Sequence, residues 1–172
     1  MNGLLLLFCL SLNPAGEEHV QIVREGYLPD ISDFAEIGLV FEAHKWFEQW
    51  SWTSEEVDEG HLVSFSGTID DQGAVDAFHA EKKYALEFGL KAMQLASYYQ
   101  LDEDKLKLRF TIRFLITKGR RFHTHSGSLG ILSKTGQWRE LELVNKTLLS
   151  VIEGMYTNQN PYISLVLGLP FK

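Results

Sequence analysis

The sequence of 172 residues contains little cysteine and little positive charge, and both shortages exclude classes of protein. Cys9 is the only cysteine, so neither a disulfide framework nor a thiolate metal site is expected. The 16 Lys and Arg residues are outnumbered by 23 Asp and Glu residues, which gives a net charge of -7. Because nucleic-acid binding requires a basic protein or a dominant basic surface, we expect no nucleic-acid partner.

Motifs with a known chemistry are also missing. The sequence has no Gly-x-Ser-x-Gly elbow, phosphate-binding loop, dinucleotide-binding fingerprint or Cys-x-x-Cys pair. His123 and His125 would lie on one face of a strand, as in a two-histidine metal pair. A third ligand is missing unless the fold brings His61 or His79 close. We therefore expect no metal site, no cofactor and no enzymatic activity.

The longest apolar run, residues 4–12, is too short to cross a bilayer, which takes about 20 apolar residues. It has the length of the core of a secretory signal, although no Lys or Arg precedes it and Asn13-Pro14-Ala15-Gly16 is a loose cleavage site. We interpret residues 1–16 as a signal-like leader, with a buried amino-terminal strand or helix as the alternative. The expected location is periplasmic or secreted, and residues 20–172 are expected to form a single domain.

The clearest pattern in the sequence is an alternation from Lys105 to Thr117. Leu, Phe and Ile occupy the even positions from Leu106 to Ile116, whereas Lys, Arg and Thr occupy the odd positions as far as Arg113. This period of two predicts a long strand with one apolar face and one basic face. Since the apolar face needs a cover, we predict an α+β fold: an antiparallel sheet of four to five strands with helices packed on one face.

The remaining elements are predicted from the same two periodicities. Strands are expected at residues 20–23, from Trp50, at 61–69 and at 121–126, with residues 127–132 continuing the last strand or forming another. Helices are expected at 33–49, where Asp33 and Glu36 have the spacing of a capping box, at 71–100 and at 138–155. Residues 161–167 fit either a strand or a helix.

The order of motifs resembles an uncharacterised family of small bacterial extracytoplasmic domains. The matching motifs are Gly26-Tyr27 at the end of a hydrophobic strand, Ile37-Gly38-Leu39-Val40-Phe41, Trp50 at the start of a hairpin, Val63-Ser64-Phe65-Ser66-Gly67, Ile112-Arg113-Phe114, Phe122 and Tyr156. The resemblance covers most of residues 20–156, and the predicted helix at 71–100 departs from it. It implies an envelope location and a small α+β fold, with no activity attached.

Cations gather on the polar faces of two strands that follow one another. Lys107, Arg109 and Arg113 belong to the first strand, and Arg121, His123 and His125 to the second. Such a row could receive an acidic partner protein, a lipid headgroup or another polyanion. Alternatively, it protects a solvated sheet face from association, or acidic residues of the same chain neutralise it.

We predict from these patterns a non-enzymatic, exported binding module that recognises a protein or envelope component through its polar, basic sheet face. Two alternatives stay open. One is a structural subunit that forms a homodimer through the helix at 72–100. The other is a small-ligand or hydrolytic pocket between sheet and helix, using His123, His125 or an acidic residue.

Overall fold

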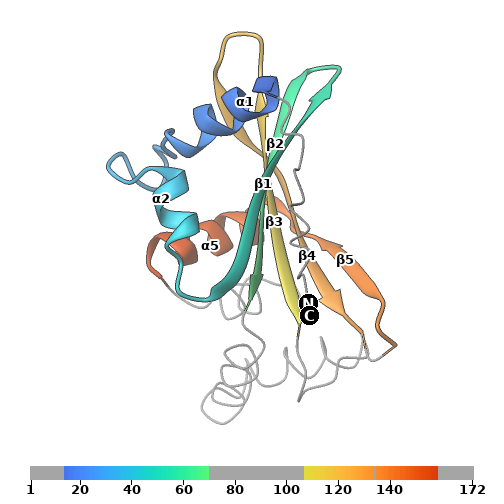
Figure 1. Ribbon diagram of the computed structural model, residues 1–172. Coiled ribbons are helices and arrows are strands. Elements are labelled where there is room, and N and C mark those ends of the chain that lie inside the picture. Colours follow the sequence, from blue (N-terminus) through green and yellow to red (C-terminus); the bar gives the residue numbers. More distant parts are fainter. Residues whose placement is uncertain (1–13, 70–106, 134, 159–172) are drawn as a thin grey trace, which may run out of the picture.

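The computed structural model describes residues 14–69, 107–133 and 135–158 (Figure 1). Their helices and strands follow in the order α1 (Pro14–Arg24), α2 (Ile37–Glu42), β1 (Phe47–Val57), β2 (Gly60–Ile69), β3 (Leu108–Ile116), β4 (Phe122–Leu132), β5 (Trp138–Glu142) and α5 (Asn145–Tyr156). The strands form one sheet in the order β1-β2-β3-β4-β5, and each pair of neighbours is antiparallel. The predicted α+β class with an antiparallel sheet is confirmed.

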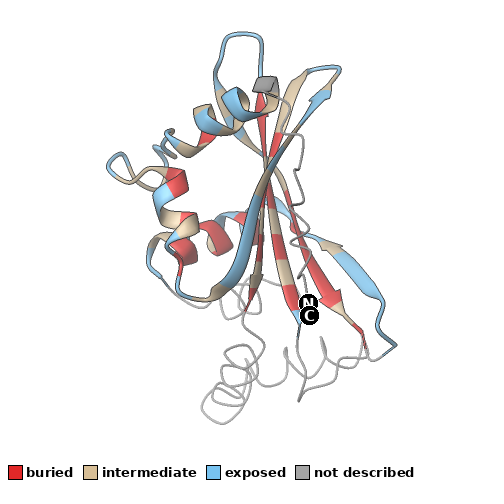
Figure 2. Cartoon of the chain, viewed as in Figure 1, coloured by how far each residue is buried: buried red, intermediate tan, exposed pale blue. Residues whose placement is uncertain are grey.

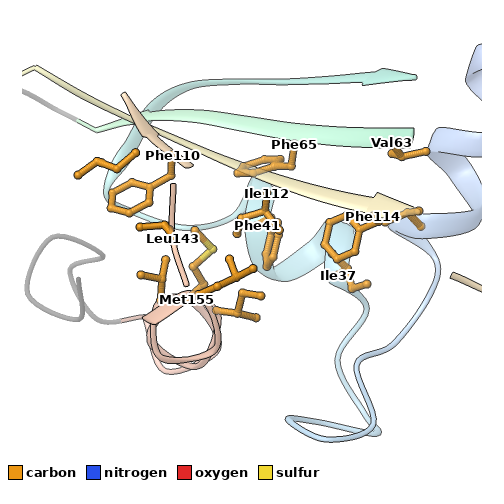
Figure 3. Close-up of a cluster of buried hydrophobic side chains, with 14 of the residues drawn as sticks. Ile37, Phe41, Val63, Phe65, Phe110, Ile112, Phe114, Leu143 and Met155 are labelled. Carbon is orange, nitrogen blue, oxygen red and sulfur yellow. The ribbon is translucent and has the colours of Figure 1, made fainter. Parts of the chain in front are cut away.

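The three described helices lie on one side of the sheet (Figure 1). Strand β3 supplies the centre of the core, because its even-numbered residues from Leu108 to Ile116 are at most 3% exposed. Figure 3 shows how Phe65, Ile112 and Phe114 point from the sheet towards side chains of α2 and α5. Each large apolar side chain buried in this way contributes roughly 1.5–3 kcal/mol. The alternation read from the sequence therefore sets the orientation of the sheet.

The predicted strand at residues 20–23 is wrong, because these residues belong to helix α1. Val20 and Val23 are three positions apart, which is the spacing of one face of a helix, and both face the core. The same short apolar run also fits a strand. A short apolar run cannot distinguish the two structures by periodicity. Glu17 in the first turn and Arg24 in the last turn complement the helix dipole and favour the helix.

The predicted helix at residues 33–49 is much shorter in the structure. Helix α2 comprises only Ile37–Glu42, and the capping box does not form, since Glu36 is the N-cap and makes no side-chain capping bond. Phe34 is 94% exposed in the preceding loop, and Phe47 already belongs to β1. Ile37 and Phe41 are the large side chains of this helix that are fully buried in the core.

The predicted helix at residues 138–155 consists of two elements. Trp138–Glu142 is the edge strand β5, and helix α5 begins only at Asn145. Leu148, Ile152 and Met155 are buried as the helical spacing predicts, whereas Val144 is the exposed N-cap. Leu141 faces the core from the strand, opposite Leu129. Apolar residues that share one helical spacing in the sequence therefore belong to a strand and to a helix.

Several predictions fall outside the described residues. They are the helix at 71–100 with its homodimer contact, the element at 161–167, the start of the long strand at Lys105 and Leu106, and the leader up to residue 13. Helix α1 begins at Pro14, inside the interval assigned to the leader. Among the described helices, none has the length and apolar character that a membrane span requires.

Candidate binding face on the sheet

The sheet has an outer face, opposite the helices, on which hydroxyl groups and arginines form rows across the strands. Residues directly opposite each other in antiparallel strands point to the same face. Because Ile112 points into the core, its neighbours Thr111 and Arg113 point outward. The row through Thr111 contains Ser51, Ser66, Thr111 and Ser128, and the row through Arg113 contains Thr53, Ser64, Arg113 and Ser126. The centre of the outer face is therefore rich in hydroxyl groups.

A shallow hollow of about 390 Å³ lies over this region and is called the hydroxyl hollow below. It is lined by Ser51, Thr53, Ser54, Glu55, Ser64, Ser66, Arg109, Thr111 and Arg113. Its floor is low because β2 contributes only the short side chains of Ser64 and Ser66, while Arg109 and Arg113 on β3 are longer. The hydroxyl oxygens of Ser66 and Thr111 are 3.5 Å apart, so these groups form at most a weak hydrogen bond. Among the described residues, neither hydroxyl has another hydrogen-bond partner.

Arg109, at one side of the hydroxyl hollow, is held by neighbours on β5. Its Nη2 donates to Glu140 Oε1 at 2.8 Å, and its guanidinium carbon lies 4.7 Å from the centre of the Trp138 ring. Gly130 lies beneath this group, because a Cβ there would come within 2.8 Å of Glu140 Oε1. The charge of Arg109 is thus largely neutralised within the chain, as one of the alternatives for the basic row anticipated.

Arg113 differs from Arg109 in its partners. It is half-buried and lies between Ser64 on β2 and Ser126 on β4. Among the described residues, none forms an ion pair with its guanidinium group. Glu55 lines the same hollow from β1, two strands away. Arg113 is therefore the cation of the described outer face that is best placed to meet an external anion.

The other predicted site residues lie away from the hydroxyl hollow. His123 and His125 are exposed on β4, and His125 is the extra residue of a bulge, since Arg113 pairs with Ser126 and Phe114 with Thr124. Arg121 is exposed beside the turn that precedes β4, and Lys107 is exposed at the opposite end of β3. The six residues are therefore distributed along the hairpin and do not form one site. Within the described residues, no group of three His, Cys, Asp or Glu side chains could hold a metal ion.

A second hollow of about 740 Å³ lies at the end of the sheet, beside α1 and the two hairpin turns. The rings of His19 and His61 stack at its wall, with centroids 3.5 Å apart and an angle of 15° between the planes. Glu18 and Arg120 form an ion pair nearby. Sequence reasoning missed the stacked pair, because nothing in the sequence indicated that α1 lies against β2. The acidic Glu56 and Asp58 and the basic Lys118 and Arg120 all line this hollow, so its charge does not select a ligand.

In a comparison with known proteins, no family model matches the chain, and no curated protein or solved structure is significantly similar to it. The residues of the outer face therefore carry the functional argument by themselves.

Proposed function

We propose that the protein is a non-enzymatic, exported binding module that recognises a protein or envelope component through the hydroxyl hollow. The observation that carries this proposal is the position of Arg113, a half-buried cation without an ion-pair partner among the described residues, beside a floor of serine and threonine hydroxyls. The partner is expected to present an anionic group to this arginine.

The chemistry of the hydroxyl hollow suits an oxygen-rich anion. A guanidinium group offers several N–H donors in one plane, which match the two oxygens of a carboxylate or the oxygens of a phosphate. Each hydroxyl can rotate to donate or to accept, so Ser64, Ser66 and Thr53 can complete the remaining hydrogen bonds of such a group. Glu55 at the opposite wall would repel a uniformly acidic ligand and so favours a partner whose anion is localised.

The shape of the outer face suits a macromolecule. Small-ligand sites are usually deep and mostly apolar, whereas this hollow is shallow, polar and open on a sheet surface. A stable protein interface covers about 800 Å² on each partner. Arg113 lies on the central strand of the described sheet, between Ser64 and Ser126, so a partner that contacts it also meets the neighbouring strands. We therefore favour a large partner over a metabolite.

Site-specific photo-crosslinking in the producing cells tests the proposal. A benzophenone amino acid at Ser51, on the exposed rim of the hollow, is expected to form an adduct with the partner, and the same group at Glu153 on α5 serves as the control. The substitution Arg113→Glu is expected to abolish the Ser51 adduct. An adduct that is unchanged by Arg113→Glu, or that forms equally well from position 153, would refute recognition through this face.

A further inference from the structure

Strand β1 forms one edge of the sheet and has a described neighbour on one side only. It pairs with β2 along its whole length, and no described strand pairs with its other side. Seven of its eleven residues are exposed, and much of this strand is pale blue in Figure 2. The exposed residues include the consecutive residues 48–51, and successive side chains of a strand point to opposite faces. Exposure on both faces is expected where a neighbouring strand is absent. An edge of this length, about 36 Å, carries a row of backbone N–H and C=O groups directed outward.

The two edges of the sheet differ in how they are protected. Strand β5 has only five residues, and three of them, Arg139, Glu140 and Glu142, are charged. Short, charged edges are the usual protection against pairing with another chain. Strand β1 is long, contains neither Pro nor Lys nor Arg, and has its single irregularity at its start, between Phe47 and Gln49. Within the described part of the chain, the stretch from Gln49 to Val57 is therefore a regular edge without a neighbouring strand on its outer side.

We infer that β1 accepts a basic, extended segment of a partner protein as a sixth strand of the sheet. The charge of this edge selects the occupant: strand β1 contains Glu48, Glu55 and Glu56 and no Lys or Arg, and Glu55 does not line the second hollow, where Lys118 and Arg120 lie. Main-chain hydrogen bonds supply affinity in this mode of binding, and alternate side chains supply specificity. Lys or Arg at alternate positions of the segment would lie beside Glu55 or Glu56.

Trp50 provides an aromatic contact on the core-side face of the same edge. Its side chain is 44% exposed, and its partner on β2 is Gly67, which has no side chain. In contrast, Trp52 is fixed by a 2.9 Å hydrogen bond from its Nε1 to Glu42. A Lys or Arg side chain of the added segment can stack on the Trp50 ring, which adds about 0.5–1 kcal/mol at an exposed site.

A second copy of the chain fits this edge less well than a basic segment. Two β1 strands paired antiparallel about Trp52 would place Glu48 of each copy opposite Glu56 of the other. Like charges in directly opposed positions destabilise a strand pair. In this register the acidic ends of β1 disfavour an edge-to-edge dimer, whereas a segment of opposite charge meets no such repulsion.

Fluorescence anisotropy with labelled synthetic peptides tests this inference on the full chain. The probe is a ten-residue peptide of alternating Lys and Val, and it is expected to bind. A copy of the peptide carries N-methyl groups on four consecutive central residues, which removes the backbone N–H donors from both sides of its strand. This copy is expected to bind at least tenfold more weakly. A copy with Glu in place of Lys is expected not to bind. Equal binding of the methylated peptide, or no binding of the Lys peptide, would overturn the inference.

Protein variants locate the peptide on the edge. The double substitution Glu55→Lys with Glu56→Lys is expected to weaken binding of the Lys peptide at least tenfold, whereas Glu153→Lys on α5 is the control of equal charge change. Arg113→Glu, on the outer face, is expected to leave binding unchanged, which separates this surface from the one proposed above. Equal losses of peptide binding for the β1 and α5 variants would indicate nonspecific charge attraction. A concentration-dependent dimer that the peptide does not dissociate would indicate that a second copy of the chain occupies the edge. Either result rejects the inference.

Discussion

At the scale of single residues, Gly60 is held by a backbone conformation that other residues rarely adopt. Its φ is 149°, and a Cβ at this position would overlap the carbonyl oxygen of Ile116 on the neighbouring strand β3. Both the positive φ and the close backbone approach disfavour a side chain. We expect Gly60→Ala to lower the free energy of unfolding by about 3 kcal/mol, measured by urea denaturation.

Gly119 provides a matched control in the other described hairpin turn. No heavy atom lies within 4 Å of the Cβ that would be added there, and its φ is not positive. Gly119→Ala is therefore expected to change the free energy of unfolding by less than about 1 kcal/mol, and a small gain would reflect the lower entropy of the unfolded chain. Similar losses for both variants would show that the close approach of Gly60 to β3 is not the cause.

Tyr156, the last residue of α5, gives the fold a dependence on alkaline pH. Burial raises the pKa of its phenol from 10.0 to about 12, and the hydroxyl donates a 3.4 Å hydrogen bond to the carbonyl of Ala35. The folded protein therefore retains this proton more strongly than the unfolded chain does. This contribution to stability is complete below pH 10 and is lost as the pH rises towards 12.

Denaturation at pH 9 and pH 11 in wild type and Tyr156→Phe measures this effect. The wild type is expected to lose more stability between the two pH values than the variant does, because phenylalanine has no proton to release. Tyr27→Phe is the control, since Tyr27 is an exposed residue. Equal pH dependence in wild type and Tyr156→Phe would assign the alkaline loss to other groups.

At the scale of elements, Glu42 joins three of them. Its carboxylate accepts hydrogen bonds from Arg24 Nη2 of α1 and Trp52 Nε1 of β1, both at 2.9 Å. Arg24 Nε also lies 2.6 Å from Oε1, at ion-pair distance but without the alignment of a hydrogen bond. The short helix α2 thus owes part of its position to this carboxylate, because its six residues cannot form a stable helix alone.

The substitution Glu42→Ala is expected to cost about 2 kcal/mol, because it leaves partly buried donors on Arg24 and Trp52 without an acceptor. Glu42→Gln is expected to cost less, since its amide oxygen can still accept from Trp52. The measurement is chemical denaturation, with the exposed Glu153→Ala as the control. A loss for Glu42→Ala no larger than that of the control would mean that the three elements are positioned by apolar packing alone.

The elements also show which parts of the fold were predictable. Strand β3 was predicted because the alternation from Leu108 to Phe114 does not fit a helix, and the hairpin of β1 and β2 was predicted from its turn and its alternating residues. Val20–Val23 and the segment before α5 were assigned wrongly, since a few apolar residues satisfy either period. In those segments the tertiary contacts determine whether a helix or a strand forms, and these contacts cannot be read from the sequence.

At the scale of the whole molecule, the candidate site was only partly predictable for a related reason. The sequence placed Arg109 and Arg113 on one face of β3, and the structure agrees. It could not show that Glu140 neutralises Arg109, because residues 138–142 were expected to be helical. Nor could it show that hydroxyls from β1 and β4 join those of β2, since that requires the register of four strands. Pairings between distant segments therefore distinguish the two arginines of the hydroxyl hollow: Arg109 has an ion-pair partner, and Arg113 has none among the described residues.

The two faces of β3 should therefore separate folding from binding. Ile112 is fully buried between the sheet and the helices, whereas the adjacent Arg113 lies on the outer face without an ion-pair partner among the described residues. Ile112→Ala is expected to lower the free energy of unfolding by about 2–5 kcal/mol through lost burial and a cavity, while Arg113→Glu is expected to change it by less than about 0.5 kcal/mol. Urea denaturation compares the two variants directly. If Arg113→Glu destabilised the fold as much as Ile112→Ala, the arginine would be a structural group, and its loss could no longer be interpreted as the loss of a contact with a partner.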